Sequence, residues 1–232
     1  MLLYYITARK QFPGNDSARR NALIGRIAEA ASAGIDYIQL REKDLGGADL
    51  EQLGREAVRA VRDHSTKTRL LINSRTDVAI AVGADGVHLT SGDISASDAR
   101  AIWAASMEAK SGPRIYRNFT ITVSCHSIQE VRLAESHGAD FAVLAPIFEK
   151  PGTAATPLGL EVLRAAAGKG QPPDLRVEAG DHRVGMPVLA LGGITLRNAA
   201  ECLRAGAVGV AGIRLFQADA VSDVVNKLRN LA

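Results

Sequence analysis

Short apolar runs alternate with longer amphipathic stretches along most of this chain. The apolar runs are rich in β-branched and aromatic side chains, which is typical of buried strands. The stretches between them carry apolar residues at helical spacing, and Asn15 or Asp16 is a candidate N-cap for the first of them. The pattern predicts strands at 2–7, 37–40, 69–73, 86–89, 120–124, 141–144, 187–191 and 208–211, and helices at 17–32, 48–62, 76–82, 97–109, 128–137, 160–167, 196–205 and 221–231.

Four segments of the chain resemble one another, at 33–40, 82–89, 137–144 and 205–212. Each has a glycine that ends a helix, then a short residue, then an apolar run, because glycine readily takes the left-handed backbone of a tight helix exit. Their spacing of about 50 to 70 residues fits two strand–helix units per repeat, which gives eight strands. The sequence therefore predicts an α/β protein with a single (β/α)8 barrel, the TIM-barrel architecture, over residues 1–232. A doubly wound sheet is the alternative, but such a sheet usually stops near five or six strands.

Composition narrows the possible functions. With 232 residues, of which 47% are hydrophobic, the chain can bury a full barrel core. Its formal net charge of +3 is small and aromatic residues make up only 4%, so we expect no nucleic-acid partner. We expect no membrane span or signal peptide, because the apolar N-terminal run ends by Thr7 and lacks a basic leader. Cys125 and Cys202 have no metal or redox spacing, which predicts reduced thiols in a cytoplasmic protein.

The densest group of candidate functional side chains lies at the end of the second predicted strand, where residues 37–43 pass from apolar to charged. Gln39, Arg41 and Lys43 alternate, so an extended backbone directs all three to one side. In a parallel barrel the loops that follow the strands meet at one face, and that face carries the chemistry. Two cations and an amide at this face suit a phosphate or diphosphate, whereas the alternative is a solvated strand end.

Other strand ends are expected at the same rim. Asn73 ends the third strand, and its amide suits a ring edge or phosphate oxygen, or merely a turn. Asp93 follows the fourth strand, where its carboxylate suits a hard divalent cation or caps the next helix. His88 lies between apolar residues, so we expect a core histidine with satisfied hydrogen bonds. His126 is the better candidate for proton transfer, and a dyad with Cys125 is disfavoured because strand neighbours face opposite sides.

The loops after the seventh and eighth predicted strands are rich in glycine. Gly192 and Gly193 follow the seventh strand, and Gly212, Ile213 and Arg214 follow the eighth. Barrels often bind a phosphate with the backbone N–H groups of these two loops, and a guanidinium adds a charge-assisted hydrogen bond. We therefore predict a phosphate site between these loops, although the glycines alone are also consistent with simple turns.

Three longer loops interrupt the alternation of strands and helices. The loop 146–159 follows the sixth strand and is rich in Gly, Pro and Thr, so it is a candidate lid. The loops 110–118 and 168–185 both precede strands, and we expect them at the opposite end of the barrel as surface loops.

Taken in order, these motifs resemble one family closely, the thiamine phosphate synthases with their sister group, the thiazole tautomerases. The resemblance runs nearly the whole length of the chain, and several motifs occur in the right order. They are Gln39-Leu40-Arg41-Glu42-Lys43-Asp44, Asn73-Ser74-Arg75, 83–89, Val123-Ser124 with His126, 138–140, 146–148, 157–159 and Gly192-Gly193-Ile194.

The resemblance implies a transferase of thiamine biosynthesis that joins a hydroxymethylpyrimidine diphosphate to a thiazole phosphate and releases diphosphate, with Mg²⁺ on the diphosphate. The implied partners are these two small phosphorylated substrates, and a homodimer is possible in this family. By the resemblance, Arg41 and Lys43 hold the diphosphate, while Ser124 contacts the diphosphate or the ring. The substrate-binding residues that it implies are Gln39, Asn73, Arg75, Gly192, Gly193, Gly212, Ile213 and Arg214, and the implied metal ligand is Asp93.

Three positions depart from the family pattern. Ser74 stands where the family usually has an aspartate that binds Mg²⁺, so metal binding rests on Asp93 alone. The family's Thr-x-Thr-Lys loop is not reproduced after Phe148, and Arg214 replaces a small serine. The missing carboxylate at position 74 favours an alternative, a metal-independent thiazole tautomerase in which His126 moves a proton. A non-catalytic barrel that binds a phosphorylated ligand is the third hypothesis.

Overall fold

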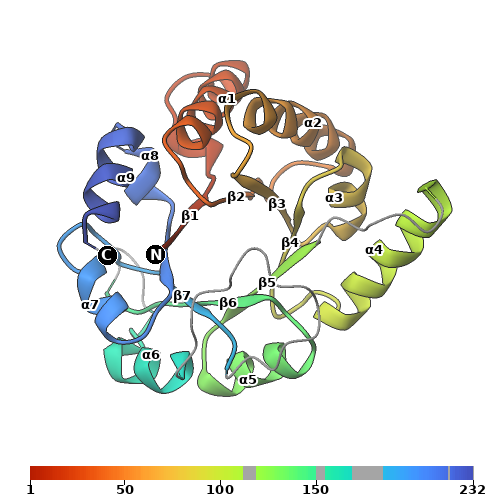
Figure 1. Cartoon of the computed structure of the whole chain (residues 1–232). Helices are drawn as coiled ribbons and strands as arrows, with labels where there is room; N and C mark the ends of the chain where they lie inside the picture. The colour runs from red at the N-terminus through yellow and green to blue at the C-terminus, as the bar shows by residue number, and fades with distance from the viewer. Residues whose placement is uncertain (112–118, 150–154, 169–184, 219, 232) are drawn as a thin grey trace.

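Eight parallel strands close into a barrel in chain order, and helices surround it (Figure 1). The structure is a computed structural model that describes residues 1–111, 119–149, 155–168, 185–218 and 220–231. The strands are β1 (Leu2–Ile6), β2 (Tyr37–Leu40), β3 (Arg69–Asn73), β4 (Gly86–Leu89), β5 (Thr120–Cys125), β6 (Phe141–Leu144), β7 (Val188–Ala190) and β8 (Gly209–Gly212). The predicted (β/α)8 barrel is confirmed, and the pairing of β1 with β8 closes the ring.

The helices follow the predicted order, with small shifts at their ends. They are α1 (Asp16–Ser32), α2 (Gly47–His64), α3 (Thr76–Val82), α4 (Ala96–Ser111), α5 (Ile128–Ser136), α6 (Gly159–Ala167), α7 (Ala199–Arg204) and α9 (Val221–Arg229), together with two short helices that were not predicted, η1 (Arg9–Gln11) and α8 (Arg214–Gln217). Asn15 is the N-cap of α1, and its side chain accepts the Ala18 N–H at 2.9 Å. The start of α7 is later than predicted because Asn198 forms a turn, accepting from the Thr195 N–H and donating to the Gly193 carbonyl.

Two apolar layers hold the barrel together. One fills its interior and includes Tyr4, Tyr37 and Phe141, whose rings are in contact. The other lies between the strands and the helices and includes Leu3 and Tyr5 of β1. Neighbouring residues of β1 thus enter different layers, as the two-residue period of a strand requires.

An aspartate in three of the four sequence repeats fastens the start of the preceding strand. Asp36 accepts the Leu3 N–H at 2.7 Å, Asp85 accepts the Leu70 N–H at 2.9 Å, and Asp140 accepts the Ile121 N–H at 2.7 Å. Each of these carboxylates also faces a guanidinium, from Arg229, Arg69 and Arg100 respectively. We call these three carboxylates the strand clamps. The fourth repeat has Val208 at the corresponding position and keeps only the backbone bond to Val188.

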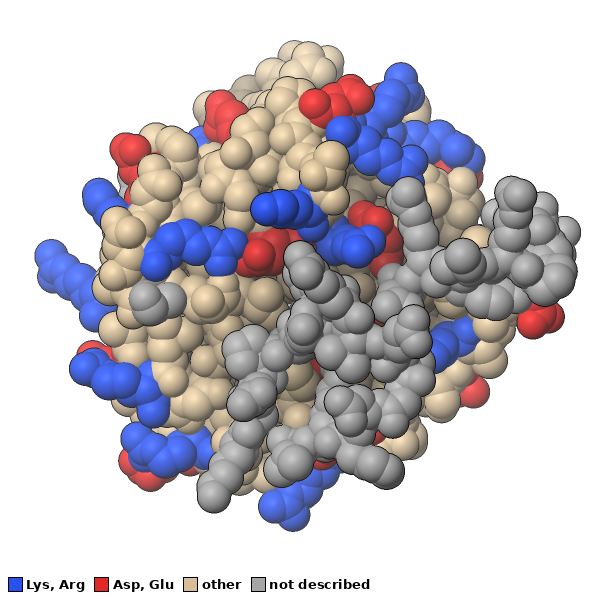
Figure 2. Space-filling model, in the orientation of Figure 1, with Lys and Arg blue, Asp and Glu red and all other residues tan. Residues whose placement is uncertain are grey.

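Most of the loops 110–118 and 168–185 lies outside the described residues. On the face shown in Figure 2, Lys and Arg side chains are interspersed with Asp and Glu side chains outside the grey residues. In the part of the chain that the structure describes, no helix has the length and apolar character that a membrane crossing requires.

Candidate active site

A cleft of about 1430 Å³ opens where the loops after the strands converge. Its walls come from segments far apart in the sequence. Arg41 lies just after β2 and Gly193 lies just after β7, and both line the cleft. Eleven of the predicted site residues line this cleft, namely Gln39, Arg41, Lys43, Asn73, Ser124, His126, Gly192, Gly193, Gly212, Ile213 and Arg214.

The segment after β2 directs alternate side chains into the cleft because the side chain between them is anchored on the other side. Glu42 is buried and accepts hydrogen bonds from the Thr7 hydroxyl at 2.7 Å and from the Arg9 backbone N–H. Burial raises the pKa of Glu42, while the Thr7 and Arg9 bonds oppose that rise. The Arg41 N–H donates to the same Thr7 hydroxyl oxygen at 2.9 Å. Glu42 therefore holds the backbone in place while Arg41 and Lys43 face the ligand space.

Among the described residues, four cations line the cleft, namely Arg41, Lys43, Arg197 and Arg214. Within the described part of the chain, none of the four forms an ion pair, whereas many other arginines do. Glu149 is the one carboxylate among the described residues that line the cleft. Cations that outnumber the carboxylates around them attract anions, so the cleft is suited to a phosphorylated ligand.

The glycines after β7 allow this loop to pack directly on the loop after β6. Gly192 and Gly193 have φ values of +94° and +67°, which side chains rarely adopt. A Cβ at Gly193 would lie 2.6 Å from the Glu149 carbonyl oxygen. The Phe148 N–H donates to the Gly192 carbonyl at 3.0 Å, which joins the two loops. The wall of the cleft at this point is therefore main chain.

A chain of hydrogen-bonded polar side chains connects β2 with the end of β3 beside the cleft. Gln39 Nε2 donates to Asn73 Oδ1 at 2.8 Å, and Asn73 Nδ2 donates to Ser74 Oγ at 2.9 Å. Gln39 is buried, and its Oε1 accepts no hydrogen bond from the described residues. A buried acceptor without a partner is costly, so a ligand that donates a hydrogen bond here gains affinity. Ser74 has a φ of +63°, a left-handed conformation that is unusual for serine.

Two histidines reach the cleft and differ in their surroundings. His88 is buried and has hydrogen-bond partners at both ring nitrogens, as predicted, but it also lines the cleft, where its Nε2 lies 2.7 Å from Ser124 Oγ. Burial lowers the pKa of His88 to about 3, with Arg41 contributing in the same direction, so the imidazole is neutral. His126 is exposed, and its Nδ1 lies 2.8 Å from the Ala145 carbonyl oxygen. Because a carbonyl only accepts, Nδ1 carries a proton, and in the neutral ring Nε2 of His126 is the nitrogen with a lone pair.

Two of the predicted residues are not among those that line the cleft. The guanidinium of Arg75 pairs with Asp77 at 2.6 Å and 2.9 Å. Asp93 Oδ2 accepts from the backbone N–H and the hydroxyl of Thr90, at 2.6 Å and 2.8 Å, so part of its carboxylate serves the turn after β4. Their roles in binding substrate and metal remain predictions. Sequence reasoning missed Arg197, which falls inside the helix predicted at 196–205 and gives no local signal.

The described residues contain no group of three or more His, Cys, Asp or Glu side chains that could enclose a metal. Mg²⁺ commonly takes only one or two carboxylates and completes its shell with water and phosphate oxygens. Asp93 has one carboxylate oxygen, Oδ1, that the Thr90 turn does not use. The residues present therefore fit a Mg²⁺ ion that is held mainly by a bound diphosphate.

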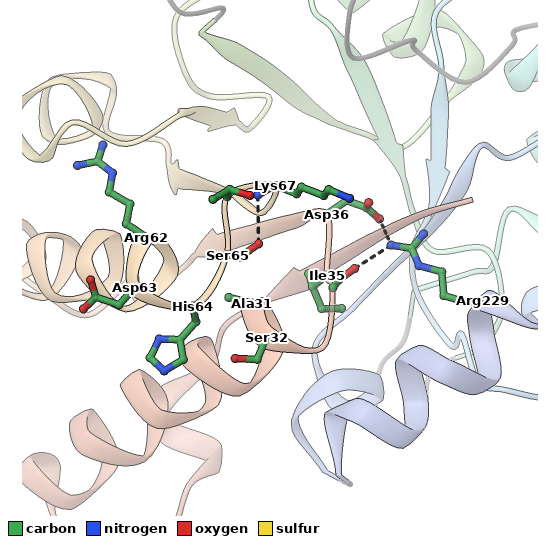
Figure 3. A pocket seen from close by; sticks show the side chains of 12 residues that line it. Ala31, Ser32, Ile35, Asp36, Arg62, Asp63, His64, Ser65, Lys67 and Arg229 are labelled. Atoms are coloured by element: carbon green, nitrogen blue, oxygen red, sulfur yellow. Dashed lines mark hydrogen bonds and ion pairs between the residues drawn. The ribbon is translucent and has the colours of Figure 1, made fainter.

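A second hollow lies at the far end of β2, between the end of α1, the end of α2 and α9 (Figure 3). Arg229 reaches across it from α9 and pairs with Asp36 at 2.8 Å. The residues that line this hollow carry both positive and negative charges, and Asp36 is already one of the strand clamps. This hollow lies at the end of the barrel where the strands begin, and its central ion pair is structural. We therefore place the candidate active site in the larger cleft.

A closed barrel with a cation-lined cleft at the loops after its strands is the arrangement of (β/α)8-barrel enzymes that act on phosphorylated ligands. More particularly, the chain belongs to the family described as thiamine monophosphate synthase, whose profile matches residues 3–216. The predicted resemblance to this family is confirmed, and with it a transferase of thiamine biosynthesis at the level of the family.

Individual relatives agree with this assignment. A thiamine-phosphate synthase of Roseiflexus sp. (strain RS-1) is 34% identical over 214 residues, which cover 91% of this chain and 76% of that protein. A thiamine-phosphate synthase of Methanospirillum hungatei is 36% identical over 185 residues, covering 80% and 77%. A solved structure, thiamine phosphate pyrophosphorylase from Pyrococcus furiosus, superposes with a TM-score of 0.73 at 28% identity, covering 99% of this chain and 94% of that one.

Proposed function

We propose that this chain is a thiamine-phosphate synthase that joins hydroxymethylpyrimidine diphosphate to thiazole phosphate and releases diphosphate. The observation that carries the proposal is the cleft itself. Four cations without ion-pair partners among the described residues share one space with the glycine loops after β7 and β8. Two separate sets of phosphate-binding groups suit a reaction between two phosphorylated rings.

The reaction needs no proton transfer. The bond between the pyrimidine methylene carbon and the diphosphate oxygen breaks, and the electron pair leaves with the diphosphate. The thiazole nitrogen then supplies the pair that forms the new C–N bond, and the positive charge remains on the thiazolium ring. The protein therefore acts by positioning the two rings and by neutralising the leaving diphosphate.

Residues from β2 and β3 suit the pyrimidine and its diphosphate. The unpartnered Oε1 of Gln39 is a ready acceptor for the amino group of an aminopyrimidine, and the bond to Asn73 fixes its amide. Arg41 and Lys43 line the same space and form no ion pair with a described residue, so they are available to the diphosphate. Ser124 supplies a hydroxyl from β5.

The opposite wall suits the thiazole phosphate. Gly193 and Gly212 present main chain to the cleft, Ile213 lines it beside them, and Arg214 and Arg197 add positive charge. A phosphate held there by N–H groups and guanidinium groups leaves the thiazole ring directed toward the pyrimidine. When it is bound, Mg²⁺ neutralises negative charge on the diphosphate, and Asp93 is the carboxylate that would hold it.

The direct test supplies both substrates with Mg²⁺ and measures thiamine phosphate by conversion to fluorescent thiochrome. We expect product from the native chain and a loss of at least about 100-fold in kcat/KM in Arg41→Ala, since a guanidinium on a diphosphate contributes several kcal/mol. Arg55→Ala is the matched control, because Arg55 pairs with Glu51 on the exposed face of α2. No product at any Mg²⁺ concentration would refute the proposal, and binding of the substrates without turnover would indicate a non-catalytic barrel.

One observation favours the thiazole tautomerase as a second candidate. His126 lines the cleft with its Nε2 available as a base, whereas the synthase reaction requires no base. The chain is therefore also tested with the thiazole carboxylate phosphate in the absence of metal. Turnover that is lost in His126→Ala would establish this activity, and His137→Ala is a control on the exposed end of α5.

A cytoplasmic location and a homodimer accompany the proposal as predictions. The two cysteines are buried and unpaired, which is consistent with a reducing compartment. Sedimentation of the purified chain measures its oligomeric state.

A further inference from the structure

A buried group of hydroxyls and an imidazole lies directly behind Ser124. Tyr4 from β1 reaches across the barrel interior to His88 of β4 and Thr122 of β5, and all three residues are buried. The Tyr4 hydroxyl lies 3.0 Å from His88 Nδ1 and 3.2 Å from Thr122 Oγ1, and Thr122 Oγ1 lies 2.7 Å from the same Nδ1. His88 Nε2 is 2.7 Å from Ser124 Oγ, so the group ends in the cleft.

Counting protons in this group determines which nitrogen of His88 carries hydrogen. Each hydroxyl must donate one hydrogen bond, because both are away from water. If Nδ1 is bare, Tyr4 donates to Thr122, Thr122 donates to Nδ1, and every proton has an acceptor. If Nδ1 carries a proton, it can accept from neither hydroxyl, and the single contact between the Tyr4 and Thr122 oxygens takes only one proton, so one buried hydroxyl has no acceptor among these atoms. The bare Nδ1, with the proton on Nε2, is therefore the favoured tautomer of His88.

The cationic form of His88 meets the same obstacle, since it also carries a proton on Nδ1. Burial disfavours that form further, and Arg41 acts in the same direction while Asp93 opposes it. His88 is thus neutral, and its Nε2–H donates to Ser124 Oγ. Because Ser124 accepts from His88, its own hydroxyl proton points elsewhere, which leaves it for a ligand in the cleft.

We propose that Tyr4, Thr122 and His88 form a hydrogen-bond relay that fixes Ser124 as a donor toward an anionic oxygen of the ligand. Without the relay, Ser124 can donate to a bare Nε2 instead and then presents only lone pairs to the cleft. Lone pairs repel a diphosphate. The tautomer of His88 therefore decides whether Ser124 attracts or repels this ligand. His88, Thr122 and Tyr4 are positioning residues, and Ser124 is the group that touches the ligand. The diphosphate as ligand rests on the proposed function, whereas the tautomer does not.

The tautomer is measured directly by NMR on the full chain labelled with ¹⁵N-histidine. We expect His88, identified by the signal lost in His88→Gln, to show a protonated Nε2 and a bare Nδ1, with no titration over about pH 5 to 9. A protonated Nδ1, or titration within that range, overturns the proposal. This result is independent of any enzymatic activity, so it is distinguishable from failure of the proposed function.

The consequence for binding is tested with inorganic diphosphate as the probe, by calorimetry. The double variant Tyr4→Phe/Thr122→Val removes both hydroxyls beside Nδ1, including the Thr122 donor, and we expect it to weaken diphosphate binding by about tenfold, as loss of one charge-assisted hydrogen bond does. In a Ser124→Ala background the same double substitution should have no further effect, since the relay acts through Ser124. Equal losses in both backgrounds would show a general structural role and overturn the proposal.

A pair of substitutions at His88 separates loss of the Nε2–H donor from misfolding. His88→Gln places an amide N–H near the position of Nε2–H, and we expect it to retain diphosphate affinity within about threefold of the native chain. His88→Leu has no donor and should lose about tenfold. If the two variants bind equally while both melt cooperatively, the relay does not orient Ser124. The NMR result on the native chain stands even where a variant does not fold.

Discussion

Substitution of Gly193 by alanine tests whether the loops after β6 and β7 are packed as closely as the geometry indicates. Gly193 has a φ of +67°, and a Cβ there would approach Glu149 O to 2.6 Å and Phe148 Cβ to 2.7 Å. Gly138 provides a matched control, because its φ is +74° and a Cβ there meets nothing within 4 Å. The two substitutions share the backbone strain and differ in the contact.

The magnitudes follow from that difference. Alanine in the left-handed region costs about 1–2 kcal/mol, which a stiffer unfolded chain offsets by about 0.4–1 kcal/mol. Gly138→Ala should therefore lose about 1 kcal/mol. Gly193→Ala adds about 1–3 kcal/mol of overpacking and about 1 kcal/mol for the weakened bond between the Phe148 N–H and the Gly192 carbonyl. We expect a total loss of roughly 3–5 kcal/mol.

Thermal unfolding measures the difference. For a chain of this size, 1 kcal/mol corresponds to about 2–4 °C in Tm, so Gly193→Ala should melt roughly 6–20 °C lower than the native chain and Gly138→Ala about 3 °C lower. The affinity for thiazole phosphate should fall in Gly193→Ala alone. Equal Tm shifts in the two variants would refute the close packing of the loops, and with it the main-chain wall of the cleft.

Three other substitutions give separate tests. Ser74→Asp adds a carboxylate at the position where the family usually has one, so it should lower the Mg²⁺ concentration needed for half-maximal synthase activity by about tenfold; an unchanged Mg²⁺ dependence would show that position 74 does not face the metal. Asp140→Ala leaves the Ile121 N–H without its carboxylate acceptor and removes the ion pair of Arg100, which keeps the Phe119 and Gly138 carbonyls, so it should lower the free energy of unfolding by about 1–3 kcal/mol with unchanged KM. His88 binds its proton more weakly in the folded state, with a pKa of about 3 against 6.5, so the unfolded state takes up the extra proton and stability falls as pH drops below about 6.5. The free energy of unfolding should fall by up to roughly 1.4 kcal/mol for each pH unit. Urea titrations at several pH values measure this slope, and His88→Gln should lack the contribution of His88 to it.

Much of the fold could be predicted from the sequence because its signals are local. The alternation of apolar runs with amphipathic stretches needs only neighbouring residues, and the repeated glycines mark helix ends. Gln39, Arg41 and Lys43 face the cleft together because a strand alternates its side chains, a rule that applies without tertiary information. The glycines after β7 were predictable for a similar reason, since a turn of this kind restricts the residue type.

The remaining features depend on partners that are distant in the sequence. His88 could be recognised as buried, but its contact with Tyr4 crosses the barrel and joins residues 84 positions apart. Arg197 lies in what reads as a helix, and only the turn made by Asn198 brings it to the cleft. The aspartates of the repeats are visible in the sequence, yet their acceptor role is not, because the N–H groups they hold are on other strands.

The strand clamps brace three of the four strand pairs, and the pair β7 and β8 has Val208 where the others have a carboxylate. In the part of the chain that the structure describes, the start of this pair is thus held by main-chain hydrogen bonds and apolar contacts without a carboxylate, and its amides should exchange with solvent sooner than those of the other pairs. At the opposite end, where these two strands finish, Gly192, Gly193 and Gly212 line the cleft. The quarter of the barrel without a carboxylate clamp is therefore also the quarter that carries the glycine loops of the cleft.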